Sequence, residues 1–230
     1  MSILVVGSFV MDCVTRTPRA PQAGETIIGI SYHNYPGGKG ANQAMTARKM
    51  GAEVMMAGMV GNDSFGETFK SLMKNAGIDI SNVKTTNQAS TGIGSITLEE
   101  NGQNRIIVVP GANHQYSVND LLTIEESIKK ASIVVAQLEM REEITEKLAE
   151  LCLVHQKKFI LNPAPASPLS KETLKSVSIL TPNETELQIL SGLKMNNIED
   201  YVQGARLLCD AGVASVVVTL GKRVVFTLTK

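Results

Sequence analysis

Short apolar strands alternate with amphipathic helices along most of this chain, and the alternation constrains the fold more than any other feature. Apolar runs of a few residues are typical of strands that are buried on both faces. Strands joined by helices pair in parallel through right-handed crossovers, so the sequence predicts an α/β fold with a three-layer, doubly wound, mostly parallel sheet. The runs occupy residues 3–7, 53–60, 133–138, 158–161, 178–180 and 215–220.

Two segments break the alternation, because β-type residues follow one another there without an intervening helix. Residues 26–35 are rich in β-branched and aromatic side chains. Residues 93–98 and 105–109 flank an Asn-Gly pair, which is a strong hairpin signal. We expect 13–36 and 91–110 to form a small β-sheet lid on an α/β core made of 1–12, 37–90 and 111–230.

Composition excludes several classes of partner. The chain has 22 Lys and Arg against 22 Asp and Glu, and a pI of about 6.8, so neither nucleic acid nor an anionic membrane is an expected partner. No apolar run reaches the ~18 residues of a membrane span, and no basic segment of a signal peptide precedes the first strand. Three widely spaced cysteines suit a reduced interior. We therefore expect a cytoplasmic protein.

A glycine-rich stretch, Tyr35 to Ala44, joins a β-type run to a helical one. It carries three glycines in four positions, interrupted by Lys39. Glycine lets a ligand lie against bare backbone, and the start of a helix presents unpaired N–H groups. The stretch can therefore hold a polar or anionic ligand, with Lys39 and Asn42 as side-chain donors, or it can be a plain strand-to-helix turn. Neither a Walker A loop nor G-x-G-x-x-G fits it.

Polar residues follow the predicted parallel strands at the edge where such sheets bind ligands. Because several of them recur at the same edge, we expect a site there, although Asp12 alone could be a solvated loop residue. Glu139 and Glu186 are natural anionic groups for organising a metal-bound phosphate. The residues at this edge are Asp12, Glu139, Asn162, Asn183 and Thr219.

A series of motifs in this order resembles the ribokinase family of sugar kinases from Ile3 to about Lys222. Within that family, the full glycine-rich string and Asn-Pro-Ala-Pro are closer to the ribose-specific branch than to the adenosine or fructose kinases. The motifs are Gly7-Ser8 with Asp12, Pro21-x-x-Gly24-Glu25-Thr26, Gly37-Gly38-Lys39-Gly40-Ala41-Asn42-Gln43-Ala44, Gly61-x-Asp63-x-Phe65-Gly66, Gly111-Ala112-Asn113, Gln137-Leu138-Glu139, Asn162-Pro163-Ala164-Pro165, Thr181-Pro182-Asn183-Glu184-x-Glu186 and Thr219-Leu220-Gly221.

The resemblance implies ATP-dependent phosphorylation of the 5-hydroxyl of D-ribose, with Mg²⁺. It implies that ATP meets Asn183, Thr219 and Gly221, and that Glu186 organises the metal. It also implies that the lid pairs two subunits into a homodimer. The sugar-binding residues implied by the resemblance are Asp12, Gly38, Lys39, Asn42 and Glu139.

One departure from the family concerns catalysis. The family places a Gly-Ala-Gly-Asp-like turn, which carries the catalytic base, after the Thr-Leu-Gly strand, and no Gly-x-Gly-Asp occurs in this sequence. We therefore expect a C-terminally truncated, catalytically impaired kinase with no assigned catalytic residue and without the family's monovalent-cation site. Alternatives are a non-catalytic sugar-binding or dimerising fragment, or a kinase for another sugar or nucleoside. Residues 224–228 could form a terminal strand beside an exposed apolar edge.

Overall fold

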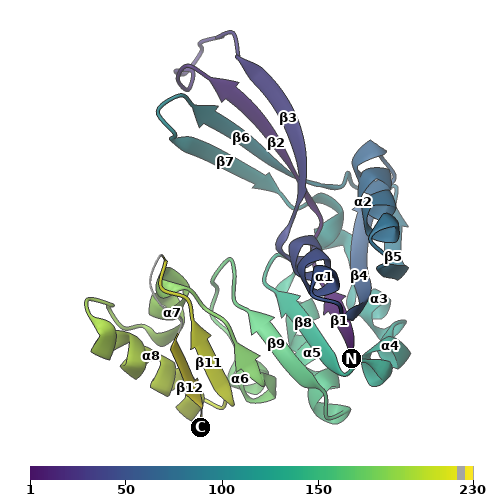
Figure 1. Ribbon diagram of the computed structural model, residues 1–230, viewed down its shortest axis with the longest axis vertical. Helices are drawn as coiled ribbons and strands as arrows, with labels where there is room; N and C mark the ends of the chain where they lie inside the picture. The colour runs from purple at the N-terminus through teal and green to yellow at the C-terminus, as the bar shows by residue number, and fades with distance from the viewer. Residues whose placement is uncertain (222–225, 230) are drawn as a thin grey trace.

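The computed structural model describes residues 1–221 and 226–229. Its main sheet has eight strands in the order β12-β11-β10-β9-β8-β1-β4-β5, and neighbours run parallel except for β12, which is antiparallel to β11 (Figure 1). The strands are β1 Ser2–Val6, β4 Glu53–Gly61, β5 Asp79–Thr86, β8 Ile133–Gln137, β9 Lys158–Asn162, β10 Ile179–Leu180, β11 Ser215–Val218 and β12 Phe226–Thr229.

Helices cover both faces of this sheet. Side chains alternate along a strand, so Val5 joins the apolar cluster beneath α1 and α2, whereas Leu4 and Val6 join the larger cluster on the other face. No described helix combines the length and the apolar character needed to cross a bilayer. The helices are α1 Lys39–Lys49, α2 Ser64–Asn75, the 3-10 helix η1 Gly111–Gln115, α3 Val118–Leu122, α4 Glu125–Lys130, α5 Glu142–Val154, α6 Lys171–Ser176, α7 Glu184–Ser191 and α8 Ile198–Asp210.

A second, four-stranded sheet in the order β3-β2-β6-β7 stands off the main body, as Figure 1 shows. Strand β2 pairs with β6 in parallel, and the outer pairs are antiparallel. The predicted fold class, a mostly parallel three-layer α/β sheet with a small second sheet, is confirmed. The strands of the second sheet are β2 Val10–Thr17, β3 Ser31–Gly37, β6 Gly92–Glu99 and β7 Asn104–Val109.

The chain passes between the two sheets through segments that brace one another. We call these segments, residues 7–9, 38, 90–92 and 110–113, the neck. The buried side chain of Asn113 accepts a hydrogen bond from the Phe9 N–H at 2.8 Å and donates to the Phe9 carbonyl at 2.8 Å. It also donates to the Pro110 carbonyl at 2.9 Å, so one amide joins two of the passages.

Asp63 braces a third passage. Its carboxylate accepts hydrogen bonds from the N–H and the hydroxyl of Thr91, both at 2.7 Å, and from the Gly66 N–H at 2.8 Å. Burial opposes its ionisation, but the hydrogen bonds from Gly66 and Thr91 outweigh burial and hold the pKa of Asp63 below its ordinary value. The same carboxylate caps α2, whereas the sequence pattern Ser64-x-x-Glu67 predicts a capping box that begins one residue later.

Three further details differ from the sequence prediction. Residues 26–30 lie outside any strand. The Ile30 N–H still donates to the Arg16 carbonyl at 2.7 Å, but β2 ends at Thr17, and Ile28 is 86% exposed. Strand β5, polar and only partly buried, carried too weak a pattern to be predicted. Asp12 lies inside β2 of the second sheet, not beyond the end of a main-sheet strand.

The predicted terminal strand is described only from Phe226 onward, where β12 pairs with β11. Residues 224 and 225 lie outside the described part of the chain. The second sheet takes in Val10 to Asp12 and Gly37, which lie beyond the predicted lid segments. The division into a core and a lid stays a prediction.

Replacing Asn113 with alanine should destabilise the neck. The N–H and carbonyl of Phe9 would be left buried without partners, and each unpaired group costs about 1–3 kcal/mol. We expect the free energy of unfolding to fall by roughly 2–5 kcal/mol in urea melts. Asn119→Ala, on an exposed position of α3, should change it by less than about 0.5 kcal/mol. Equal stability of the two variants would contradict the bracing role.

Candidate functional site

The start of helix α1 is closed by a side chain from another part of the chain. Glu139, two residues beyond β8, accepts a hydrogen bond from the Lys39 N–H at 2.8 Å and one from the Ser8 hydroxyl at 2.5 Å, both on Oε2. The first turn of α1 contains no acidic residue and Gly38 offers no capping side chain. The Glu139 carboxylate therefore supplies the negative charge that the amino end of the helix favours.

The glycines of the predicted strand-to-helix turn allow this close approach. Gly38 has φ +87°, a left-handed conformation that favours glycine. A Cβ at Gly40 would lie 2.4 Å from the Ser8 backbone nitrogen, so only glycine lets α1 begin against the β1–β2 passage. The Gly40 N–H donates to the Ser8 hydroxyl at 3.2 Å. The predicted glycine-rich turn into a helix is confirmed.

Asp12 lies in a slot between two glycines of the neighbouring strands. A Cβ at Gly37 would lie 2.6 Å from its Oδ2, and one at Gly94 would lie 2.8 Å from its Oδ1. Partial burial, and then repulsion from the Glu139 carboxylate, raise the pKa of Asp12 above its ordinary value. Asp12 and Glu139 are thus within electrostatic reach of each other, although Asp12 lies in the second sheet and Glu139 follows a strand of the main sheet.

The structure brings the Lys39 N–H, next to Gly38 in the chain, into contact with Glu139, and it places Asp12 within electrostatic reach of Glu139. Asn42 is exposed in the first turn of α1, and its side chain bonds no described residue. The Lys39 ammonium likewise forms no ion pair among the described residues. Both side chains are therefore free to donate to a ligand.

A second group of predicted residues gathers at the ends of β10 and β11. Asn183 and Thr219 form an isolated parallel bridge, and the Thr219 N–H donates to the Pro182 carbonyl at 3.0 Å. Asn183 and Glu186 form a capping box at the start of α7, in which both Glu186 oxygens accept hydrogen bonds from Asn183. Gly221 follows with φ +50°.

The two groups lie at the same edge of the main sheet but on different strands. Glu139 follows β8 and Thr219 follows β11, which is three strand spacings away, or about 14 Å at ~4.8 Å per step. Asn162 ends β9 between them, and its amide donates to the Thr181 carbonyl at 3.3 Å. A single ligand that touches both groups must therefore be longer than one sugar ring.

The arrangement does not form a ready-made metal centre. Among residues 1–221 and 226–229, no cluster of three or more His, Cys, Asp or Glu side chains could hold a metal ion. Magnesium commonly takes one or two carboxylates and completes its coordination with water and substrate phosphate. Glu186 is half-buried and already accepts two hydrogen bonds from Asn183, so it fits at most a shared role and not a closed protein cage.

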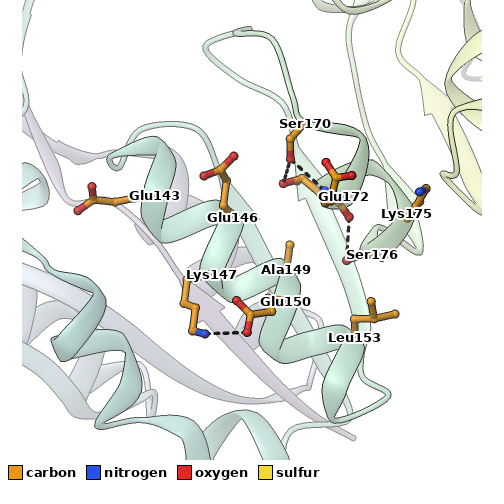
Figure 2. A pocket seen from close by; sticks show the side chains of 11 residues that line it. Glu143, Glu146, Lys147, Ala149, Glu150, Leu153, Ser170, Glu172, Lys175 and Ser176 are labelled. Carbon is orange, nitrogen blue, oxygen red and sulfur yellow. Dashed lines mark hydrogen bonds and ion pairs between the residues drawn. The ribbon is translucent and has the colours of Figure 1, made fainter.

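A large groove lies away from these residues. It measures about 660 Å³ and runs between α5 and α6, where Figure 2 shows Lys147 paired with Glu150 along one wall. Its lining consists of surface glutamates, lysines and small residues from these two helices, and it contains none of the predicted site residues. Size alone does not identify the functional site in this molecule.

Three residues that shape the candidate site, Ser8, Gly94 and Asn113, have no role predicted from the sequence. Ser8 bonds Glu139, Gly94 makes room for Asp12, and Asn113 fixes the neck beneath them. The serine could have been noticed, because a polar residue directly after a buried strand needs a partner. Gly94 could not, because its importance depends on the register between β2 and β6.

Glu139→Gln should lower the pKa of Asp12. The substitution removes the like charge that raises this pKa, but it leaves the larger contribution from burial, so the value should fall without returning fully to the ordinary one. Carbon-13 NMR titration of the aspartate carboxyl groups would measure it, with Glu143→Gln on α5 as control. An unchanged Asp12 pKa would show that the charge of Glu139 does not act on the Asp12 carboxyl.

Comparisons with known proteins agree with this geometry. Residues 1–230 match the model of the pfkB family carbohydrate kinases. Haemophilus influenzae ribokinase is 36% identical over 229 residues, covering 100% of this chain and 75% of the relative. Salmonella typhi deoxyribokinase is 33% identical over 231 residues, covering 100% and 76%.

A solved structure gives the same result. Arabidopsis thaliana ribokinase complexed with ribose and ATP aligns with a TM-score of 0.92 at 31% identity, covering 99% of this chain and 74% of that one. The chain thus spans about three quarters of the length of these relatives. It belongs to the pfkB family of carbohydrate kinases.

Proposed function

We propose that this chain binds D-ribose, or a similar sugar, between Asp12 and Glu139, as the sugar site of an ATP-dependent ribose 5-kinase. Two carboxylates carry the proposal: Glu139 is bonded at the α1 start, and Asp12 lies within its electrostatic reach, so together they can accept hydrogen bonds from several hydroxyls of one ring. Asn42 and the Lys39 ammonium add donors at the same place. The Arabidopsis relative, solved with ribose and ATP, supports this choice of ligands.

The nucleotide would bind at the ends of β10 and β11. Asn183, Thr219 and Gly221 lie together there, and the start of α7 offers N–H groups to phosphate. The ~14 Å between the groups suits a sugar and a triphosphate that meet between them. When bound with the nucleotide, Mg²⁺ neutralises charge on the phosphates, and Glu186 is the residue that would hold it. We assign no residue to a monovalent cation.

No residue of this sequence is proposed as the catalytic base. Asp12 and Glu139 belong to sugar binding, and the sequence has no Gly-x-Gly-Asp turn. A polypeptide made of these residues alone should therefore bind sugar but turn over slowly, because losing a general base costs ~10²–10⁴ in rate.

Ribose binding to the wild type and to Asp12→Asn tests the site. The asparagine keeps the size but loses the charged acceptor, which is worth roughly 1.5–3 kcal/mol, so affinity should fall about 10- to 150-fold. Calorimetry would measure it, with Asp210→Asn at the end of α8 as control. Equal affinities of the wild type and Asp12→Asn would refute the assignment. In a coupled assay with ATP, turnover in the usual kinase range of ~1–100 s⁻¹ would refute the impairment.

We also propose that the second sheet is a lid that pairs two copies. Ile96 faces Ile106 across β6 and β7, and Val108 lies on the same face as Asp12. Ile106 is 53% and Val108 56% exposed. Exposed apolar side chains grouped on one face of a small sheet usually mark a partner surface.

Sedimentation velocity at micromolar concentration tests the lid dimer. We expect the wild type to sediment as a dimer and Ile106→Lys as a monomer, because a buried lysine in the interface is costly. Leu207→Lys, at an exposed apolar position on α8, should remain dimeric. A monomeric wild type, with or without ribose, would exclude the lid dimer.

Two alternatives remain as outcomes of the same experiments. In one experiment, the chain is extended by the remaining segment of a full-length relative. If it then dimerises and binds ribose but does not turn over, the protein is a non-catalytic sugar-binding or dimerising protein. Tighter binding of 2-deoxyribose or adenosine than of ribose would indicate a kinase for another sugar or nucleoside; the similarity to a deoxyribokinase is the observation behind this alternative.

A further inference from the structure

Ser8 is a fully buried polar residue at the point where β1 leaves the main sheet. Its hydroxyl accepts a hydrogen bond from the Gly40 N–H at 3.2 Å and donates to Glu139 Oε2 at 2.5 Å. Its carbonyl accepts from the Ala41 N–H at 3.0 Å. Two separate hydrogen bonds from helix α1 therefore fix the position of Ser8, and its hydroxyl in turn restricts the position of the Glu139 carboxylate.

The direction of the serine hydrogen follows from these contacts. Because the Gly40 N–H already donates to the oxygen, the single hydroxyl hydrogen is left for the carboxylate. Glu139 Oε2 then receives two donors, from Ser8 and from the Lys39 N–H. Glu139 Oε1 accepts nothing from the described residues and is not among the buried unpartnered atoms, so it is open to solvent.

We propose that Ser8 is a positioning residue, which holds one oxygen of Glu139 against the start of α1 so that the other faces the sugar. The proposal rests on the proposed sugar site. Without the hydroxyl, Glu139 would keep only the Lys39 N–H as an anchor and could turn away from Asp12, which repels it. The sugar would then have to order the carboxylate, and its affinity would fall.

A double-mutant cycle on ribose affinity separates positioning from general damage. We expect Ser8→Ala to weaken binding about 10-fold, and Glu139→Gln to weaken it at least as much, as the loss of a charge-assisted bond would. Because Ser8 acts through Glu139, the double variant should bind within about twofold of Glu139→Gln. Ser176→Ala, another buried serine whose hydroxyl bonds only the Glu172 carbonyl within α6, should bind like the wild type.

A second measurement needs no ligand. In Ser8→Ala the released Glu139 should move away from Asp12, and the pKa of Asp12, followed by carboxyl NMR, should fall toward its ordinary value. Wild-type affinity in Ser8→Ala, multiplicative losses in the double variant, or an unchanged Asp12 titration would each overturn the proposal. If the wild type binds no ribose while Asp12 still responds to Ser8→Ala, then the sugar site is wrong and the positioning role stands.

Discussion

The amide of Asn113 is the contact on which both sheets depend. It satisfies the N–H and the carbonyl of Phe9 at the point where the chain leaves β1, and it also holds the Pro110 carbonyl where the chain returns from β7. A buried peptide N–H or carbonyl without a hydrogen-bond partner is costly. Where the chain leaves both sheets, a side chain must therefore supply the missing hydrogen bonds. Together with the Asp63 contacts to Thr91, this amide fixes how the two sheets sit against each other where the chain passes between them.

Charge at the candidate site is balanced by backbone rather than by basic side chains. Glu139 is held by the Lys39 N–H and the Ser8 hydroxyl at the amino end of α1, whereas Asp12 is partly buried and repelled by Glu139. The start of α1 thus holds Glu139 in place, whereas burial and the nearby charge of Glu139 disfavour the ionised form of Asp12. A carboxyl whose pKa is shifted by burial and by a specific neighbouring charge is a candidate functional group.

The fold class could be predicted from the sequence, because buried strands and amphipathic helices have recognisable local patterns of apolar residues. The sequence also located Glu139, Asn183 and Thr219, since polar residues after parallel strands meet at one edge. The position of Asp12 was predicted wrongly. Only three residues separate β1 from β2, and the partner β6 lies far along the chain, so the sequence around Asp12 resembles a loop. Residues 26–30 misled for the opposite reason: their side chains are of β type, but β2 ends at Thr17 and β3 begins only at Ser31.

The slot that holds Asp12 belongs to the second sheet, whereas Glu139 is anchored to the main body. The two like charges repel each other, and the work of bringing them closer grows as water leaves the space between them. A polyhydroxylated molecule that donates to both carboxylates would offset this repulsion, whereas a molecule without hydroxyls would not. The distance between the two carboxylates is therefore sensitive to the chemistry of whatever lies between them.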